Sequence, residues 1–267
     1  MARETYTHGH DAAVLAAHGV RTATDSAPHL LAHLAPGLDL LDVGCGPATI
    51  TADLAAAVAP GRVVAVDAAA EAVEAARATV AARGVDVEVR VGDVYALGEP
   101  DGAFDVVHAH QVLQHLADPV AALVEMRRVC RPGGVVAVRD ADYAGFFWTP
   151  RPAGLDRWIE LYHPVARANG GEPDAGRRLP TWARAAGFDD VVVTGSCWVF
   201  AAPADRARWA GQWARRTAPG SRFAVQVLDR GLASLAEVAE VAGAWQVWAE
   251  AEDALFVVPH VELVCRA

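Results

Sequence analysis

The sequence predicts an α/β protein built on a doubly wound, mostly parallel sheet of seven strands. Three observations lead to this prediction. Short Val-rich runs alternate with segments of helical length between residues 40 and 138. The runs are almost continuously apolar, as expected for strands that a parallel sheet buries on both faces. Gly and Pro residues punctuate the ends of the intervening segments. Alternating strands and helices imply right-handed crossovers, with helices on both sides of the sheet.

The expected strands and helices follow from these runs. Five strands should come first, at Leu40–Val43, Val63–Asp67, Val87–Val91, Phe104–His108 and Val135–Val138. Helices are expected between them at Thr49–Val58, Ala70–Arg83 and Pro119–Cys130, the last with Asp118 as N-cap and Pro119 at the first helical position. Two later strands are expected at Val191–Phe200 and Leu255–Cys265. Pro259 lies inside the last strand, which predicts a bulge or an edge position there.

The chain divides into four expected parts. These are an N-terminal helical lid (1–36), a ligand-binding core (37–143), a helical cap segment (144–186) and the last two strands with a helical insertion at 203–252 (187–267). All eight Trp residues lie between Trp148 and Trp248. We therefore expect a regular scaffold in the first half of the chain and a bulky, shaped interior in the second.

Composition excludes several classes of function. The 267 residues carry a net charge of −10, which argues against a nucleic-acid partner. The four Cys are not paired at metal-ligand spacing, and His8-Gly9-His10 has no matching carboxylate cluster, so we expect no metal site. No apolar run is long enough to span a membrane and no signal peptide is evident, which predicts a cytoplasmic protein. A homodimer is compatible with the sequence.

A glycine turn after the first strand is the first candidate binding element. Gly44 and Gly46 follow the strand and open a helix, so the backbone there can turn tightly and approach a ligand. Asp67 ends the next strand, where an acid accepts hydrogen bonds from ribose hydroxyls in nucleotide-binding folds. Taken singly, the glycines make an ordinary turn and Asp67 makes a helix cap. Together they favour a nucleoside ligand.

Two further polar elements end the third and fourth strands. In Gly92-Asp93-Val94, the Asp93 carboxylate can accept a hydrogen bond from an adenine amino group while the Val94 N–H donates one; the alternative is a plain turn. His110-Gln111 ends the fourth strand. All these elements fall on the carboxyl edge of one sheet, where open α/β sheets bind their ligands.

This series of motifs resembles the class I S-adenosyl-L-methionine-dependent methyltransferases, and most closely the UbiE/MenG-like subgroup. The resemblance covers residues 36–142 and rests on Leu-Asp-Val-Gly-Cys-Gly (41–46), Val-Asp (66–67), Gly-Asp-Val (92–94), the run 105–119 and Arg-Pro-Gly-Gly (131–134). It implies a Rossmann-like fold, S-adenosyl-L-methionine as cofactor and methyl transfer to a small molecule, with aromatic and natural-product acceptors as candidates.

The resemblance also implies roles for single residues. Asp42, Gly44 and Gly46 would hold the methionyl part, Asp67 the ribose, and Asp93 and Val94 the adenine, with His110 and Gln111 beside the cofactor. The expected cofactor-binding set is completed by Tyr6 and Arg21 from the lid and by Cys45, Ala68 and Gly92 from the same turns. Arg21 is expected to pair with the cofactor carboxylate or to lie on the surface. The chain departs from the family at Ala48, where a third glycine is frequent, and in the insertion at 203–252.

Catalysis of this kind needs alignment and a dry pocket more than a catalytic group. If the acceptor is a hydroxyl or an acidic carbon, a base is needed. His115 is the first candidate, because it follows the fourth strand; the alternative is that it braces the loop through Asp118. Asp142 and Tyr143, just beyond the fifth strand, are further candidates, and turn formation is their alternative role.

Aromatic residues of the second half are candidates for the acceptor pocket. Trp148, Tyr162 and Trp198 are expected to contact the substrate, although aromatics at helical spacing are more often part of a core.

Two other readings of the glycine turn remain open. A nicotinamide-dependent oxidoreductase shares the turn and the acid, but Thr49 stands where its third glycine belongs, and the chain has no Lys for a Tyr-x-x-x-Lys pair. A cyclase-like enzyme or a binding module could retain the fold without methyl transfer.

Overall fold

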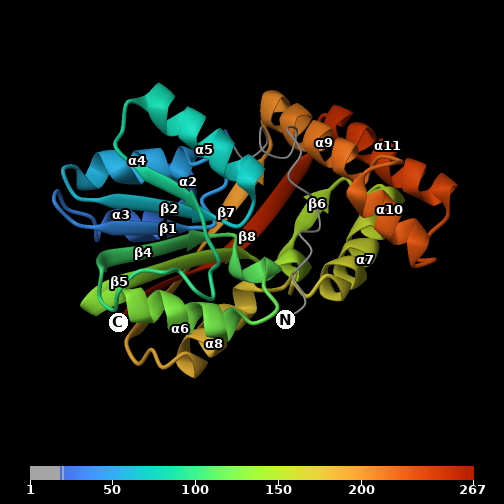
Figure 1. Cartoon of the computed structure of the whole chain (residues 1–267). Coiled ribbons are helices and arrows are strands. Elements are labelled where there is room, and N and C mark those ends of the chain that lie inside the picture. The colour runs from blue at the N-terminus through green and yellow to red at the C-terminus, as the bar shows by residue number, and fades with distance from the viewer. Residues whose placement is uncertain (1–18, 20) are drawn as a thin grey trace.

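A central sheet with helices on both faces forms one part of the molecule, and a bundle of helices lies at one end of it (Figure 1). The computed structural model describes residue 19 and residues 21–267. Most of the expected lid, including Tyr6, lies outside the described residues. The doubly wound α/β fold predicted from the sequence is confirmed.

The sheet has eight strands among the described residues, one more than predicted. Five parallel strands are β1 (Leu40–Val43), β2 (Val63–Asp67), β3 (Glu88–Val91), β4 (Phe104–His110) and β5 (Cys130–Ala141). The antiparallel part consists of β6 (Phe147–Thr149), β7 (Val191–Phe200) and β8 (Leu255–Arg266). The strand order is β3-β2-β1-β4-β5-β8, with β7 along the other side of β8. The additional strand is β6, which pairs with the first residues of β8.

The sequence predicted either a bulge or an edge position at Pro259. The structure shows no bulge there, and Pro259 has a partner strand on only one side. Its register with β7 runs without a shift, opposite Cys197. On its other side, pairing with β5 ends at His260 and pairing with β6 begins at Val257. The missing N–H of Pro259 is tolerated in such a gap between partner strands.

Two helical layers cover the sheet. One contains α2 (Ala23–Ser26), α3 (Pro28–Leu31), α4 (Thr49–Val58) and α5 (Ala70–Arg83), and the other contains α6 (Pro119–Val129) and α8 (Leu179–Ala185). The short 3-10 turns are Leu113–His115, Tyr143–Gly145 and Gly176–Arg178. As predicted, α6 starts at Pro119, with the Asp118 side chain accepting from Ala121 N. The described end of the lid is thus two four-residue helices packed on the sheet.

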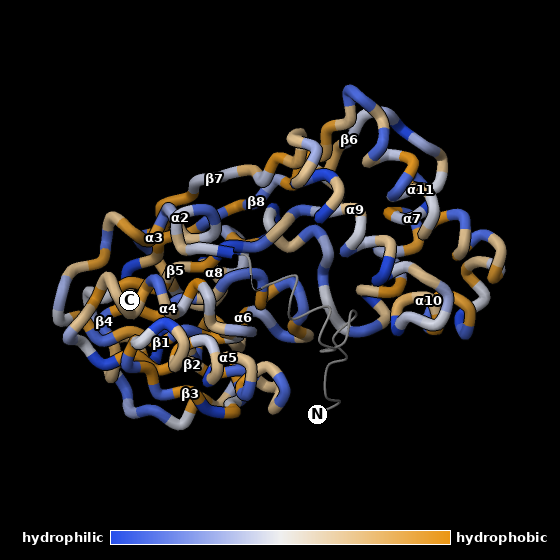
Figure 2. The backbone as a smooth tube through the Cα atoms, turned by 90° about the horizontal axis from the view of Figure 1, so that it is seen from above, coloured by the Kyte–Doolittle hydropathy of each residue, from blue (hydrophilic) through white to orange (hydrophobic). Residues whose placement is uncertain are grey.

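The cap is the bundle of α7 (Ala153–Ala168), α9 (Pro203–Thr217), α10 (Arg222–Asp229) and α11 (Leu235–Glu250). Seen from above, these helices lie beside the sheet and its layers (Figure 2). The cap has its own apolar core, centred on Trp158. The centre of its ring lies 4.5 Å from the ring centre of Trp213 and 4.8 Å from that of Trp245. The expected segment 144–186 therefore contributes to both parts, because α7 joins the cap while Leu179 and Ala183 of α8 join the core of the sheet.

The strand registers align the ends that the sequence singled out. Val43 lies opposite Val66 on one side and Ala109 on the other. Asp67 lies opposite Val91, and His110 opposite Arg139. The turns after β1, β2, β3 and β4 therefore emerge at one edge of the sheet.

Candidate active site

The turn between β1 and α4 leaves open space beside its backbone. Gly44, Gly46 and Ala48 all have positive φ, at 69°, 54° and 59°. A Cβ added at Gly44 would overlap the side chain of Val112, so this glycine is needed for close packing. A Cβ added at Gly46 would meet no atom within 4 Å. The turn thus offers room for a ligand directly at Gly46.

Asp67 is bound to this turn. Its Oδ2 accepts from the backbone N of Gly46 and its Oδ1 from that of Ala69, both at 2.9 Å, while Ala68 between them is exposed. A carboxylate has about four lone-pair sites, so two remain for ribose hydroxyls. The residues present therefore fit a nucleoside at this edge.

The turn after β3 lies next to Asp67. The backbone N of Gly92 donates to Asp67 O at 3.0 Å. The Asp93 side chain is exposed, and its Oδ1 accepts from Tyr95 N at 2.9 Å. Asp93 and Val94 thus lie beside Asp67, the residue expected to bind the ribose.

Two expected cofactor residues face the protein interior. The Asp42 carboxylate is 3% exposed and is bound by Thr51 Oγ1 and by His108 Nδ1, the latter at 2.8 Å. Through these contacts Asp42 can hold the end of β1 and the start of α4 in place on either side of the glycine turn. Cys45 is partly buried, and burial together with the nearby Asp42 and Asp67 raises the pKa of its thiol.

His110 and Gln111 end β4 in an unusual environment. His110 is 7% exposed, and neither ring nitrogen has a hydrogen-bond partner among the described residues. Burial, followed by the charges of Arg21 and Arg139, holds the pKa of His110 well below its usual value. Gln111 has a positive φ of 54°, and its Nε2 lies 2.9 Å from Nε2 of His260.

A cavity of about 260 Å³ separates the sheet edge from the cap. From the sheet side, Gln111, Tyr143 and Trp198 line it, and Arg21 lies with its guanidinium carbon 4.9 Å from the centre of the Trp198 ring. The cap side carries both aromatic and polar side chains. The aromatic ones are Phe146, Phe200, Trp209 and Trp213, and α9 adds the polar and charged side chains of Asp205, Arg208, Gln212 and Arg216.

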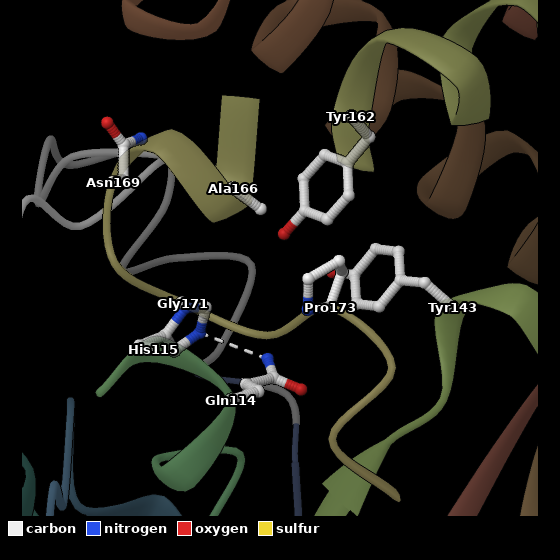
Figure 3. A pocket seen from close by; sticks show the side chains of 8 residues that line it. All are labelled: Gln114, His115, Tyr143, Tyr162, Ala166, Asn169, Gly171 and Pro173. Carbon is white, nitrogen blue, oxygen red and sulfur yellow. Dashed lines mark hydrogen bonds between the residues drawn. The ribbon is translucent and has the colours of Figure 1, made fainter. Parts of the chain in front are cut away.

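The three candidate bases differ in their surroundings. Asp142 is 6% exposed, and its carboxylate accepts from Nε of Arg177 at 2.7 Å and from Nη2 at 2.5 Å. His115 Nε2 lies 3.0 Å from Gln114 Nε2, and Asp118 instead caps α6. His115 and Tyr143 line a second pocket of only about 10 Å³ (Figure 3). Only Tyr143 of the three also lines the large cavity.

The expected substrate residues separate into two groups. Trp198 lines the cavity. Trp148 is 6% exposed and stacks on Phe256, with ring centres 5.4 Å apart. Tyr162 is 1% exposed and stacks on Tyr143 at 4.3 Å; it lines the small pocket (Figure 3). Trp148 and Tyr162 thus lie in the aromatic core, the alternative role that the sequence left open.

The sequence analysis missed a layer of buried polar residues on one face of the sheet. Arg139 Nε lies 3.1 Å from Glu262 Oε1, and both side chains are at most 4% exposed. His29, on α3, lies 3.8 Å from the same Glu262 oxygen, and burial lowers its pKa to about 3. The available signal for this layer was the spacing of His260 and Glu262, two polar residues that lie two positions apart in an otherwise apolar strand.

Metal sites and membrane spans are absent from the part of the chain that the structure describes. No group of three or more His, Cys, Asp or Glu there can hold a metal ion. Likewise, none of its helices combines the length and apolar character needed to cross a bilayer.

Comparisons with known proteins identify the family. Residues 41–138 match a family model described as a methyltransferase domain. The chain is 33% identical over 272 residues to an uncharacterized methyltransferase of Schizosaccharomyces pombe, which covers 98% of this chain and 96% of that protein. It is 29% identical over 278 residues to a probable methyltransferase of Aspergillus luteorubrus, covering 97% and 96% of the two chains.

Solved structures support the fold. The YcgJ protein of Bacillus subtilis has a TM-score of 0.59 at 17% identity, over 90% of this chain and 98% of that one. The match to methyltransferases decides against a nicotinamide-dependent oxidoreductase. With the full-length likeness to a methyltransferase and the nucleoside-compatible edge, this chain belongs to the class I S-adenosyl-L-methionine-dependent methyltransferases.

Proposed function

We propose that this enzyme methylates a small, planar acceptor held in the cavity between the sheet and the cap. One observation supports this most strongly: Gln111 belongs both to the carboxyl edge of the sheet and to the cavity wall. An acceptor in the cavity would therefore lie next to the cofactor edge. The aromatic rings on the cap side favour flat molecules, in keeping with the UbiE/MenG-like resemblance.

The cofactor site is proposed at the carboxyl edge. When bound, S-adenosyl-L-methionine supplies an electrophilic methyl group on a sulfonium. The open space at Gly46 admits the ligand, Asp67 accepts from the ribose hydroxyls, and Asp93 with Val94 binds the adenine. The neutral His110 beside this position adds no positive charge of its own next to the sulfonium.

The chain contributes to the reaction mainly by positioning and by excluding water. Fixing two reactants in a near-attack geometry can lower a barrier by about 7–11 kcal/mol. Trp198 and Trp213 line the cavity with apolar rings, which favours a step in which charge is neutralised. Tyr143 is the candidate base that remains for the acceptor, because it alone of the three lines this cavity.

Filling the cavity tests this proposal. Ala141 lines its floor, so Ala141→Leu should obstruct the acceptor but not the cofactor edge. Labelled methyl transfer from S-adenosyl-L-methionine is measured on a panel of planar aromatic hydroxyl compounds and matched aliphatic alcohols. We expect turnover of planar acceptors by the wild type. Ala141→Leu should lower the rate of methyl transfer by about tenfold or more, because displacing a reactant by about 1 Å can cost about 100-fold in rate.

The control is Ala236→Leu, the same change at an exposed position of α11. Calorimetric binding of S-adenosylhomocysteine should be equal in both variants and in the wild type, which shows that the fold is intact. Equal turnover by Ala141→Leu, or binding of the cofactor without methyl transfer to any acceptor, contradicts the proposal. The second outcome favours a cyclase-like or binding role.

A further inference from the structure

Gln111 has a backbone conformation that residues with a side chain rarely adopt. Its φ is 54°, and in the described part of the chain Ala48 alone shares a positive φ among non-glycine residues. The backbone N of Gln111 donates to Arg139 O at 2.7 Å, which anchors the turn. Such strain persists where the surroundings enforce it and concentrates at functional sites. The fold therefore directs this side chain specifically.

One neighbour fixes the Gln111 amide. Its Nε2 lies 2.9 Å from Nε2 of His260, which is 2% exposed. A carboxamide carries two N–H donors, and the contact with the imidazole uses at most one, whichever way the amide is oriented. Because Gln111 also lines the cavity, at least one N–H is left to donate to an oxygen of a ligand there.

The cavity wall has a positive excess, although the chain as a whole has a net charge of −10. Among the described residues, three arginines line it against two aspartates, which leaves a formal charge of +1: Arg21, Arg208 and Arg216 against Asp25 and Asp205. Arg208 and Asp205 form an ion pair at 2.8 Å. In the described part of the chain, the other titratable groups at or behind this wall include Tyr143, Cys197, His110, His260 and the buried pair Arg139–Glu262.

The same positive potential acts on His260. Burial, followed by the charges of Arg139 and Arg21, holds the pKa of His260 well below its usual value. A neutral imidazole in this setting is a poor acceptor for a proton from the substrate, because the resulting cation would be buried near two arginines. The wall is better suited to a ligand that brings its own negative charge.

We infer that Gln111 is an acceptor-binding residue that donates a hydrogen bond to the ionised oxygen of an acidic hydroxyl, a phenolate or an enolate. His260 acts as its positioning residue, and the arginines of the cavity favour the anion. The proton of the hydroxyl passes to bulk water on binding, so an acceptor of this acidic class needs no base such as Tyr143. This inference deepens the proposed function and rests on it, since it names the chemical class of the acceptor.

The test measures the ionisation of a bound probe rather than turnover. 4-Nitrophenol is titrated by absorbance in the presence of the full-length protein saturated with S-adenosylhomocysteine. We expect the pKa of the bound probe to fall by about one unit, equivalent to about tenfold tighter binding of the anion than of the neutral phenol. Binding of nitrobenzene, which cannot ionise, is measured in parallel.

Matched variants assign the effect. Gln111→Met removes the N–H donor with little change in size and should abolish most of the pKa shift. Gln212→Met makes the same change on the cap side of the cavity and should retain the shift. His260→Leu should leave a reduced shift, because the Gln111 amide loses its fixed orientation. Unchanged affinity for S-adenosylhomocysteine shows that each variant is folded.

Each result separates this inference from the proposed function. If nitrobenzene binds while the pKa of bound 4-nitrophenol is unchanged or raised, the anion inference is overturned and the acceptor cavity stands. If Gln111→Met keeps the full shift, the role of Gln111 is overturned. If neither probe binds, the acceptor cavity and the inference are both overturned.

Discussion

Single residues at the sheet edge combine a structural task with the binding task proposed for them. Asp67 accepts from Gly46 and Ala69 through different carboxylate oxygens, and it thereby fixes the glycine turn against the end of β2. The proposed ribose contacts use the remaining lone pairs. Loss of the charge should therefore affect both the turn and the ligand.

Asp67→Asn tests this residue. An amide offers one oxygen in place of two and directs an N–H group toward one of the present donors. Hydrogen bonds to charged groups contribute about 1.5–3 kcal/mol, so Kd for S-adenosylhomocysteine should rise by about tenfold or more. Isothermal titration calorimetry gives this value. Asp189→Asn, at an exposed site before β7, is the control, and equal affinity of the two variants contradicts the assignment.

The buried pair of Arg139 and Glu262 predicts a large effect on stability. Glu262 also accepts from Thr194 and Ser196. Its removal leaves the buried guanidinium of Arg139 without its hydrogen-bonded counter-charge. Breaking such a pair costs about 3–5 kcal/mol, whereas replacing both partners by apolar residues costs less. Urea unfolding should therefore show Glu262→Met to be less stable than Arg139→Met/Glu262→Met. The opposite order refutes this account of the pair.

Asp140 predicts a pH dependence of stability. Burial raises its pKa from 3.8 to about 7, and its Oδ1 accepts from Gln114 N at 3.0 Å. Between these pH values the native state retains a proton that the unfolded state has lost. Below about pH 3.8, Asp140 therefore makes its full contribution to the free energy of unfolding. This contribution falls as pH rises toward about 7 and is lost above that value, by up to about 1.4 kcal/mol per pH unit.

Urea unfolding of Asp140→Asn across this range provides the comparison. The amide oxygen can keep the bond from Gln114 without titrating. The wild type should lose stability relative to Asp140→Asn as pH rises from about 4 to about 7. If the difference in free energy of unfolding between the two proteins does not change with pH, the pKa of the Asp140 carboxyl is not raised in the native state.

At the scale of elements, periodicity and turn residues predicted most of the structure. The insertion at 203–252 was expected to be helical, and α9, α10 and α11 lie there. β6 was missed because Phe147–Thr149 is too short to show an alternation. The packing of α8 on the sheet instead of the cap depends on tertiary contacts that no local pattern contains.

The capping box of α11 supplies an element-scale prediction. Ser234 Oγ accepts from Glu237 N, and the Glu237 carboxylate accepts from Ser234 N. Ser234→Ala should lower the free energy of unfolding by about 1 kcal/mol. Because α11 belongs to the cap and not to the carboxyl edge, affinity for S-adenosylhomocysteine should stay within twofold, as calorimetry can show. A large loss of affinity contradicts this separation of cap and edge.

At the scale of the whole molecule, the sequence grouped the residues of the proposed cofactor edge better than those of the proposed acceptor wall. Gly46, Asp67 and Asp93 follow strands that are consecutive in the chain, so local motifs and the rules of parallel sheets placed them together. The contact of Gln111 with His260 joins residues 149 positions apart. It depends on the register of β8, which local motifs do not reveal.

Long-range packing also explains why the sequence did not separate the aromatic residues of the cavity from those of the core. Trp148, Tyr162 and Trp198 have similar chemistry, yet only Trp198 faces the cavity. The face that each presents is decided by how the cap helices and β7 pack, not by residue type. Counting aromatics therefore indicated a shaped interior without separating its wall from its core.

The central claim is that the cofactor binds at the carboxyl edge with its reactive end toward the cap cavity. A crystal structure of the protein with S-adenosylhomocysteine tests it most directly. The account predicts ribose hydroxyls within hydrogen-bond distance of Asp67, adenine beside Asp93 and Val94, and the sulfur facing the cavity at Gln111. Electron density for the ligand elsewhere, or a sulfur directed away from that cavity, contradicts it.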